Sequence, residues 1–212
     1  YKNWFDSEIP THMPDYIEKK MGLWRTKPDD KALKPLFSTG AELHILIMNV
    51  EAFSTKKGMD FADKFLSSHK ALMGIDESTT IKNPAAKRTK NIVSLRPLTK
   101  YRRILTGSPV TKSPLDLFSQ CYFLDPFLLD QSSYYVFRTR YAVCRKINVS
   151  GRSVEIVVGY RNLGELSEKL KEFSYRVLKD DCLDLPKKTF VKRTVELTDE
   201  QKKLYKQMKQ EA

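Results

Sequence analysis

Runs of apolar residues of strand length recur along the first half of the chain. LHILIMNV at 43–50, ALMGID at 71–76 and YRRILTG at 101–107 each stand between polar segments. Near-continuous runs of this length are typical of strands that are buried on both faces of a parallel sheet. A segment of helical character, residues 60–69, separates the first two runs. This alternation predicts βαβ crossovers and an α/β fold with an open parallel sheet flanked by helices.

The pattern of the second half predicts a different arrangement. Residues 113–126 are predicted to form a helix, because Pro114 suits its first turn and Asp116 suits its positive end. Pro126 would end this helix. The elements expected further on are hairpin strands at 141–149 and 152–160, a helix at 163–173, strands at 175–179 and 189–197, and a final helix with a capping box at Thr198 and Gln201.

Composition narrows the class of protein. The 212 residues are 41% hydrophobic, which is enough for one sizeable core or for a core with an appendage. Mean hydropathy is −0.48. No apolar run approaches the roughly 18 residues of a membrane helix, so no membrane partner is expected. The three cysteines, Cys121, Cys144 and Cys182, lie far apart, which argues against a disulfide framework and predicts a reducing, intracellular environment.

The number and distribution of charged residues indicate a class of binding partner. Lysine and arginine number 38 against 26 aspartates and glutamates, for a net charge of +12. Nine of the basic residues lie between Lys82 and Lys112, and no acid occurs between Glu77 and Asp116. Basic side chains displace counterions from phosphates. The surplus could serve solubility alone, but its concentration in one segment favours contact with nucleic acid.

Two adjacent acids end the run at 71–76: Asp76 closes it and Glu77 follows. In an open α/β sheet, ligands bind outside the carboxyl ends of the strands. One carboxylate can hold Mg²⁺ there, largely through water, and the other can orient and deprotonate the water that attacks a γ-phosphate. The same acids could instead cap a helix or add solubility, so the pair by itself does not decide between these interpretations.

A hydroxyl-rich turn, Thr106-Gly107-Ser108, ends the run at 101–107. If the two strands are sheet neighbours, this turn lies beside the acids, where its hydroxyls can bond a carboxylate or a phosphate-held water. The alternative interpretation is a Ser-Pro turn that only precedes the helix at 113–126.

Together these segments resemble a known family. IDESTTIKN and RRILTGSPVTKSPLDLFSQCYFLDP resemble motifs II and III of the Swi/Snf-type DNA translocases, which are ATPases of helicase superfamily two. YKNWFDSE, ILIMNVEAF and YRVLKDDCLDLPKK resemble other segments of that family, so the resemblance spans nearly the whole chain. It implies a RecA-like first lobe at 1–126, an extension at 127–180, and an exit segment at 181–212 that leads toward a second RecA-like lobe.

The resemblance implies a role for each matching residue. Asp76 would bind Mg²⁺–ATP and Glu77 would activate water, so ATP and Mg²⁺ are the expected cofactors. Thr106, Gly107 and Ser108 would couple the nucleotide state to the grip on duplex DNA. The residues expected to contact DNA, without sequence preference, are Asn49, Lys82, Lys87, Arg88 and Lys100.

Several positions depart from, or qualify, the family pattern. Thr79 stands where the family usually has histidine, so coupling through an imidazole would be absent or altered. Trp4, in a matching Asn-Trp pair, is expected to pack in the core. The chain contains no Gly-x-Gly-Lys-Thr phosphate loop, and the resemblance places this loop upstream of Tyr1 and an arginine finger beyond Ala212. Phosphoryl transfer uses both groups, so the chain alone is not expected to hydrolyse ATP.

Three functional interpretations stay open on the sequence. The first is part of a DNA-dependent ATPase that translocates on duplex DNA. The second is an inactive lobe that binds DNA or a protein partner, and the third is another nucleotide enzyme of the same architecture, such as a restriction-type translocase. The intact Asp76 and Glu77 favour an enzyme. Its expected location is the cytoplasm of a bacterial or phage-infected cell, or the nucleus if the source is eukaryotic.

Overall fold

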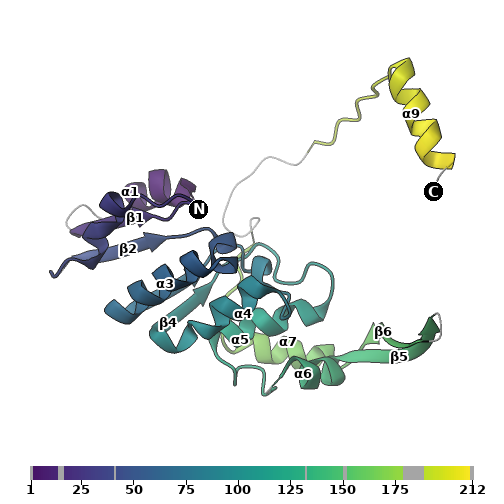
Figure 1. Cartoon of the computed structure of the whole chain (residues 1–212). Helices are drawn as coiled ribbons and strands as arrows, with labels where there is room; N and C mark the ends of the chain where they lie inside the picture. Colours follow the sequence, from purple (N-terminus) through teal and green to yellow (C-terminus); the bar gives the residue numbers. More distant parts are fainter. Residues whose placement is uncertain are drawn as a thin grey trace. The chain divides into compact units, whose positions relative to one another are not determined.

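The chain forms two compact units, residues 1–174 and residues 175–212 (Figure 1). Among the described residues, the first unit contains six strands and the second contains one helix. The structure is a computed structural model that describes residues 2–13, 17–40, 42–131, 133–149, 152–178 and 189–210.

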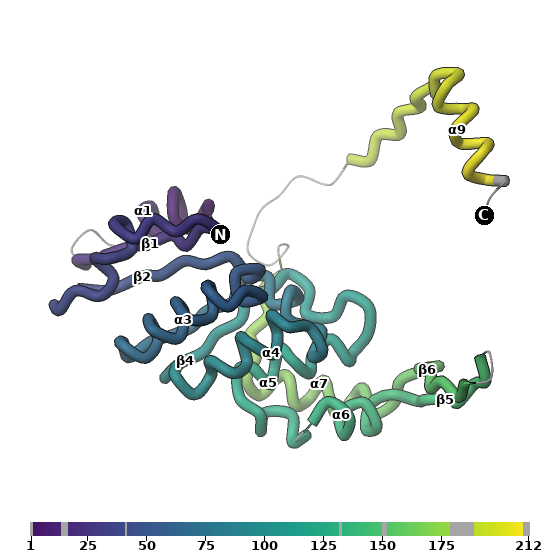
Figure 2. The backbone as a smooth tube through the Cα atoms, in the orientation of Figure 1, coloured from purple at the N-terminus to yellow at the C-terminus, as the bar shows by residue number. Residues whose placement is uncertain are grey.

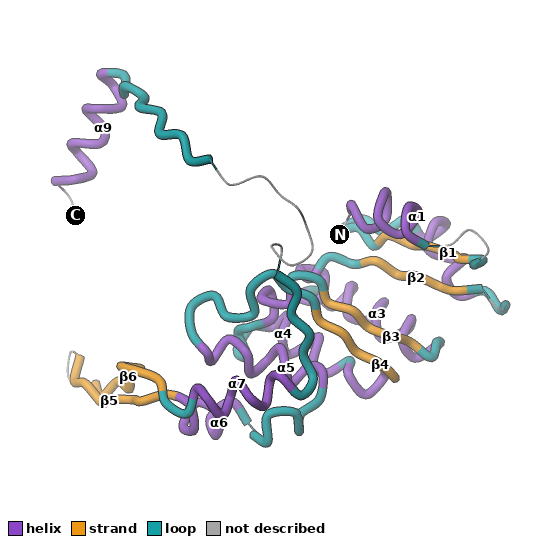
Figure 3. The backbone as a smooth tube through the Cα atoms, turned by 180° about the vertical axis from the view of Figure 1, so that it is seen from behind, coloured by secondary structure: helices purple, strands orange, loops and turns teal. Residues whose placement is uncertain are grey.

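Two pairs of parallel strands belong to the first unit (Figure 3). β1 (Lys19–Leu23) pairs with β2 (Leu43–Ile47), and β3 (Ala71–Ile75) pairs with β4 (Thr99–Ile104). The α/β class and the parallel pairing predicted from the apolar runs are therefore confirmed. Within the part of the chain that the structure describes, the two pairs are not hydrogen-bonded to each other, so they form two ladders rather than one continuous sheet.

Helices connect the strands, as the alternation predicted. α3 (Lys56–Ser68) lies between β2 and β3, and its cap Thr55 accepts a hydrogen bond of 3.1 Å from the amide of Gly58. A Cβ on Gly58 would lie 2.2 Å from the carbonyl oxygen of Ala52, so only glycine fits there. The other helices of this unit are η1 (Trp4–Glu8), α1 (Ile9–His12), α2 (Asp30–Leu33), η2 (Lys34–Phe37), η3 (Val50–Ser54), η4 (Ser78–Ile81), α4 (Lys87–Ser94), η5 (Arg96–Leu98), η6 (Pro114–Asp116), α5 (Leu117–Leu124), α6 (Tyr134–Tyr141) and α7 (Leu163–Lys171).

One face of β3 is covered and the other is open. Ala71 and Ile75 are buried in the main core, together with residues of α3 and α4. Leu72 points to the opposite face and is 61% exposed, and no atom of the described residues lies within 4 Å of a Cβ built on Gly74. Alternate side chains of a strand point to opposite faces. The expectation that this strand is buried on both faces is therefore wrong for the structure described.

α5 lies between two cores, and this position explains its apolar character. Phe123 belongs to the main core. Phe118 and Cys121 belong to a second core, which continues into α6 and α7. A helix that is apolar on all sides is typical of a buried element. The predicted helix at 113–126 is confirmed as η6 followed by α5.

The hairpin predicted after α6 is confirmed. β5 (Ala142–Val149) and β6 (Arg152–Tyr160) pair antiparallel, and Figure 2 shows the two strands running together away from α6. Ala142 anchors the inner end in the second core. Most side chains further along the hairpin are exposed, so its stability depends on this anchored end.

Two strands predicted near the C-terminus are not formed. Residues 175–178 and 189–197 have no strand structure, and residue 179 of the first predicted strand lies outside the described residues. The alternating residues Val191 and Val195 are 74% and 80% exposed. Alternation favours a strand only where a neighbouring strand pairs with it, and none of the described residues provides one here.

The helix predicted at the C-terminus is confirmed as α9 (Asp199–Gln210). Its capping box also forms: the amide of Thr198 donates to Oε1 of Gln201 (3.0 Å), and the amide of Gln201 donates to Oγ1 of Thr198 (3.3 Å). Across the described parts of the chain, no helix has both the length and the apolar character needed to cross a membrane.

Candidate functional site

The carboxyl ends of β3 and β4 form the rim on which the site is built. The amide of Leu105 donates to the carbonyl of Ile75 (2.9 Å), and the amide of Ser78 donates to the carbonyl of Leu105 (2.9 Å). These bonds continue the parallel ladder past the last residues of both strands. The acids after β3 and the turn after β4 therefore emerge side by side, as expected for sheet neighbours.

Asp76 and Glu77 lie at this rim, and both are exposed. The amide of Glu77 donates to Oδ1 of Asp76 (2.9 Å). Glu77 itself has φ 49° and ψ 57°, in the left-handed region that is uncommon for residues other than glycine. Glu77 in this conformation connects the end of β3 to the start of η4.

Trp4 contacts the acid pair, which the sequence did not predict. Its indole Nε1 donates to Oδ2 of Asp76 (2.8 Å), and the residue is 39% exposed. The expectation that Trp4 packs in the core is therefore wrong. Because η1 buries none of its residues, this side chain is available to reach the rim. Seventy-two positions separate the two partners, so no local pattern could have revealed the contact.

The hydroxyls of the turn after β4 bond within the turn itself. The amide of Ser108 donates to Oγ1 of Thr106 (3.2 Å), and Oγ of Ser108 donates to the carbonyl of Val110 (3.0 Å). No atom of the described residues lies within 4 Å of a Cβ built on Gly107. The turn is thus positioned beside the acids, while its side-chain hydrogen bonds shape the loop that follows.

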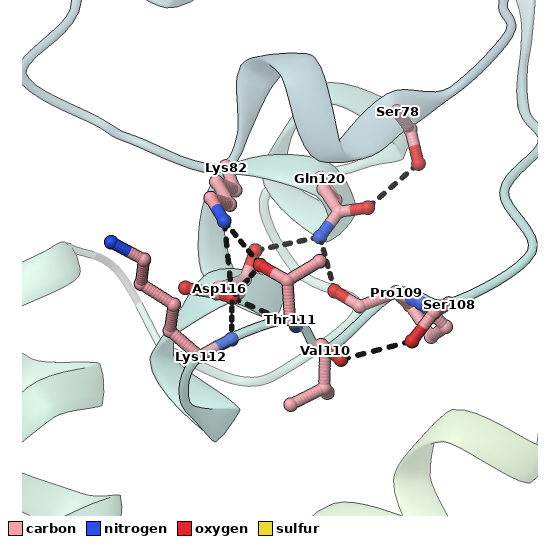
Figure 4. Close-up of polar contacts among 9 residues, drawn as sticks. All are labelled: Ser78, Lys82, Ser108, Pro109, Val110, Thr111, Lys112, Asp116 and Gln120. Carbon is pink, nitrogen blue, oxygen red and sulfur yellow. Dashed lines mark hydrogen bonds and ion pairs between the residues drawn. The ribbon is translucent and has the colours of Figure 1, made fainter. Parts of the chain in front are cut away.

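A buried side-chain bond joins the two motifs (Figure 4). Ser78 follows the acid pair, and its Oγ donates to Oε1 of Gln120 on α5 (2.6 Å). Nε2 of Gln120 donates to the carbonyls of Pro109 (2.8 Å) and Asp116 (2.7 Å). Ser78 and Gln120 are both 0% exposed. Sequence analysis missed this link, although a glutamine within the otherwise apolar LFSQCYFL was a usable signal.

Asp116 holds the loop between the turn and α5 (Figure 4). Its Oδ2 accepts hydrogen bonds from the amide of Thr111 (3.0 Å), the hydroxyl of Thr111 (2.8 Å) and the amide of Lys112 (2.9 Å). The ammonium of Lys82 lies 3.7 Å away and also donates to the Thr111 hydroxyl. Burial raises the pKa of the Asp116 carboxyl, but these hydrogen bonds and the Lys82 charge outweigh burial and hold that pKa below its usual value.

The residues expected to contact DNA have different surroundings. Asn49 caps η3 by accepting from the amide of Glu51 (3.0 Å). Arg88 pairs with Glu51 and donates to the carbonyl of Thr80 (2.9 Å). Lys82 pairs with Asp116. Lys87 and Lys100 are exposed, and the Lys100 ammonium lies 5.1 Å from the centre of the Tyr101 ring. The structure therefore brings Asn49 and Arg88 together around one glutamate, and DNA contact by the set stays a prediction.

The exposed Asp-Glu pair and the Thr-Gly-Ser turn share one rim outside the carboxyl ends of parallel strands, which is where open α/β sheets bind their ligands. The chain matches the SNF2-related domain over residues 2–212. It therefore belongs to the family of SNF2-related domain proteins. This membership confirms the family resemblance drawn from motifs II and III.

The relatives include a TATA-binding protein-associated factor and a chromatin-remodeling ATPase. The chain is 33% identical over 132 residues to TATA-binding protein-associated factor MOT1 of Saccharomyces cerevisiae. The aligned region covers 62% of this chain and 7% of that protein. It is 26% identical over 215 residues to Chromatin-remodeling ATPase INO80 of the same species. That aligned region covers 98% of this chain and 13% of INO80. Both relatives are yeast proteins, so nothing supports the expected bacterial or phage source.

Among solved structures, the chain is similar to the SWI2/SNF2 ATPase core of Sulfolobus solfataricus in complex with dsDNA. Sequence identity is 26% and the TM-score is 0.46, over 66% of this chain and 25% of that one. The chain thus spans a small part of each relative described, between 7% and 25% of its length.

Proposed function

We propose that the chain is part of the first nucleotide-binding lobe of a DNA-dependent ATPase that translocates on duplex DNA. Membership of the SNF2-related family supports an ATP-hydrolysing enzyme at the level of the family. The observation that carries the proposal is the shared rim: Asp76 and Glu77 are exposed beside the turn that contains Thr106 and Ser108. A triphosphate that docks outside this rim would meet both motifs at once.

The carboxylate of Asp76 suits Mg²⁺. Mg²⁺ keeps much of its water and is usually bound through one or two carboxylates together with substrate phosphates. No group of three potential ligands forms a ready-made metal cage among the described residues, which agrees with that mode of binding. Asp76 is exposed and its two oxygens each accept one hydrogen bond, so each retains a lone pair for the ion or its water. The bound ion would neutralise phosphate charge.

Glu77 is proposed to act on the attacking water. Two separate exposed carboxylates at one rim allow one acid to serve the ion while the other accepts a proton. The hydrogen bond that its amide donates to Asp76 keeps the two residues in one fixed relation. This division of roles requires two acids at adjacent positions, which is what the rim presents.

Duplex DNA is proposed as the partner. The net charge of +12 and the acid-free basic segment at 82–112 support binding through phosphates. Such binding is tolerant of sequence and weakens steeply with salt. The proposed contacts are Asn49, Lys82, Lys87, Arg88 and Lys100. Lys82 would have to exchange its pairing with Asp116 for a phosphate.

Glu77→Gln in the whole protein tests the enzyme proposal. The amide keeps the shape of the side chain but cannot accept the proton, so ATP turnover should fall by roughly 10²- to 10⁴-fold while nucleotide and DNA binding persist. Glu168→Gln, on the exposed surface of α7, is the matched control and should leave turnover unchanged. Turnover in Glu77→Gln equal to that of the wild type would exclude the assigned role.

A second candidate is an inactive lobe that binds DNA or a protein partner. The observation that favours it is the hydrogen bond from Trp4, which already occupies one oxygen of Asp76. An inactive lobe would show no ATP turnover in the wild-type whole protein, and Glu77→Gln would then change neither turnover nor DNA binding. The same experiment therefore separates the two candidates.

A further inference from the structure

The side chain of Gln120 makes hydrogen bonds to three residues, Ser78, Pro109 and Asp116. A primary amide carries two N–H donors and one acceptor oxygen. Both donors are used, on the carbonyl oxygens of Pro109 and Asp116. The amide can therefore lie in only one orientation, with Oε1 facing Ser78, and the Ser78 hydroxyl must be the donor. The Gln120 side chain that makes these three bonds is fully buried.

These three bonds connect the two motifs of the rim. Ser78 directly follows the Asp76-Glu77 pair, and Pro109 directly follows the turn at 106–108. The hydroxyls that sequence analysis expected to link the motifs, those of Thr106 and Ser108, bond within their own loop instead. Apart from the backbone ladder, the described residues show two side-chain connections between the motifs: one through Gln120 to Ser78 and Pro109, and one from Lys82 to Thr111 and Asp116.

The connection continues into the basic loop before α5. The second amide hydrogen of Gln120 is bonded to the carbonyl of Asp116, and the carboxylate of the same residue holds the amides of Thr111 and Lys112. Lys82, which directly follows η4, pairs with the same carboxylate oxygen at 3.7 Å. A displacement of Ser78 would therefore be passed to the loop at 109–112, which carries Lys112.

We propose that Gln120 is a positioning residue that couples the nucleotide state at Asp76 and Glu77 to the loop at 109–112. The inference rests on the proposed function, because it assumes that this rim binds ATP and that the basic loop faces DNA. A buried bond has no water to replace it, so the groups that it joins move together rather than separate. Gln120 touches neither nucleotide nor DNA in this scheme, and it acts through Ser78 and Pro109.

The test compares ATP turnover of the whole protein with and without duplex DNA. Gln120→Leu keeps an apolar side chain of similar size but removes all three hydrogen bonds. We expect the stimulation of turnover by DNA to fall by roughly 5- to 100-fold, the usual range for coupling between two sites. Cys121→Ala is the matched control, since Cys121 is a buried neighbour on α5 outside the network. It should keep the wild-type stimulation.

Two further variants separate coupling from loss of structure. Ser78→Ala removes one bond and leaves the Nε2 bonds of Gln120, so it should lower DNA stimulation in the same direction. In Gln120→Glu, a carboxylate would face two carbonyl oxygens, and only the protonated acid can donate to one of them. Stimulation in Gln120→Glu should therefore rise as pH is lowered, relative to wild type. A side chain with a purely structural role would not produce this pH profile.

The outcomes distinguish the inference from the function on which it rests. If wild-type turnover is absent or unaffected by Glu77→Gln, the proposed function fails. If turnover is lost in Glu77→Gln but Gln120→Leu and Ser78→Ala keep the wild-type stimulation, the function stands and the role of Gln120 is overturned. If Gln120→Leu does not fold, Ser78→Ala and the pH profile of Gln120→Glu decide. Equal stimulation in those two variants and the wild type at every pH overturns the role as well.

Discussion

Asp116→Asn is the substitution whose effect the structure predicts most directly. The carboxylate of Asp116 accepts three hydrogen bonds through one oxygen, from Thr111 and Lys112. Asparagine keeps the size and one acceptor oxygen but removes the negative charge. The three bonds then lose their charge assistance, and the ammonium of Lys82 at 3.7 Å loses its partner. The loop before α5 should open more often as a result.

The size of the effect follows from these contacts. A hydrogen bond to a charged group contributes about 1 kcal/mol more than a neutral one, so three bonds sum to about 3 kcal/mol. The ion pair adds less than 1 kcal/mol, because Lys82 is partly exposed to water. Since the bonds share one oxygen and are not additive, we expect a loss of roughly 2–3 kcal/mol in the free energy of loop opening. This corresponds to roughly 30- to 160-fold faster hydrogen exchange of the Thr111 and Lys112 amides.

The assay is amide hydrogen exchange at matched pH, with Asp125→Asn as the control. Among the described residues, the carboxylate of Asp125 accepts one hydrogen bond, from the amide of Phe127 beyond the other end of α5, so Asp125→Asn should leave the loop amides unaffected. Because the folded pKa of Asp116 lies below its usual 3.8, the carboxylate stabilises the loop fully above that pH. The difference in the free energy of loop opening between wild type and Asp116→Asn is lost as pH falls through the pKa of Asp116 in the folded protein. Unchanged exchange at neutral pH, or a difference that persists into strong acid, would refute the reasoning.

Three further predictions concern other side chains. Ser119→Ala should raise the free energy of unfolding, measured by urea denaturation, by roughly 1 kcal/mol. The reason is that the Ser119 hydroxyl is buried without a hydrogen-bond partner among the described residues. A lower free energy of unfolding would show that the hydroxyl has a partner. Burial raises the pKa of Cys121 to about 12. Peptide mass spectrometry after mild alkylation should therefore find Cys144 modified and Cys121 unmodified, and equal labelling would contradict this. Trp4→Phe removes the N–H donated to Asp76 and should weaken Mg²⁺–ATP binding by the whole protein roughly 3- to 10-fold in calorimetry. Unchanged affinity would mean that the contact does not orient the carboxylate.

The elements that the sequence predicted well are those with a local cause. The apolar runs ending near Ile47, Ile75 and Ile104 form strands because their local pattern favours a strand and each has a parallel neighbour to pair with. The C-terminal capping box forms because both partners lie within one turn of helix. β1 was missed, since Lys19 and Gly22 interrupt any apolar pattern. A Cβ on Gly22 would lie 2.4 Å from Cδ1 of Leu36, so a larger residue there would force the buried Leu36 side chain to shift.

The two C-terminal strands show the opposite case. The segment at 189–197 alternates apolar and polar residues, as a strand does, but a strand is completed by hydrogen bonds to a neighbour. No described strand pairs with this segment, so its alternation does not produce a strand. The same reasoning applies to the exposed face of β3, where the sequence of Leu72 and Gly74 suggested burial that no described element supplies.

The sequence by itself determined which groups this protein carries: an Asp-Glu pair, a hydroxyl turn and a basic segment at the spacing of SNF2-related proteins. It predicted that the first two lie together if their strands are sheet neighbours, and the parallel pairing of β3 with β4 meets that condition. Only the tertiary structure decided which side chains connect them. Gln120 meets Ser78 across 42 positions and Trp4 meets Asp76 across 72, and such contacts depend on how whole elements pack rather than on any local pattern.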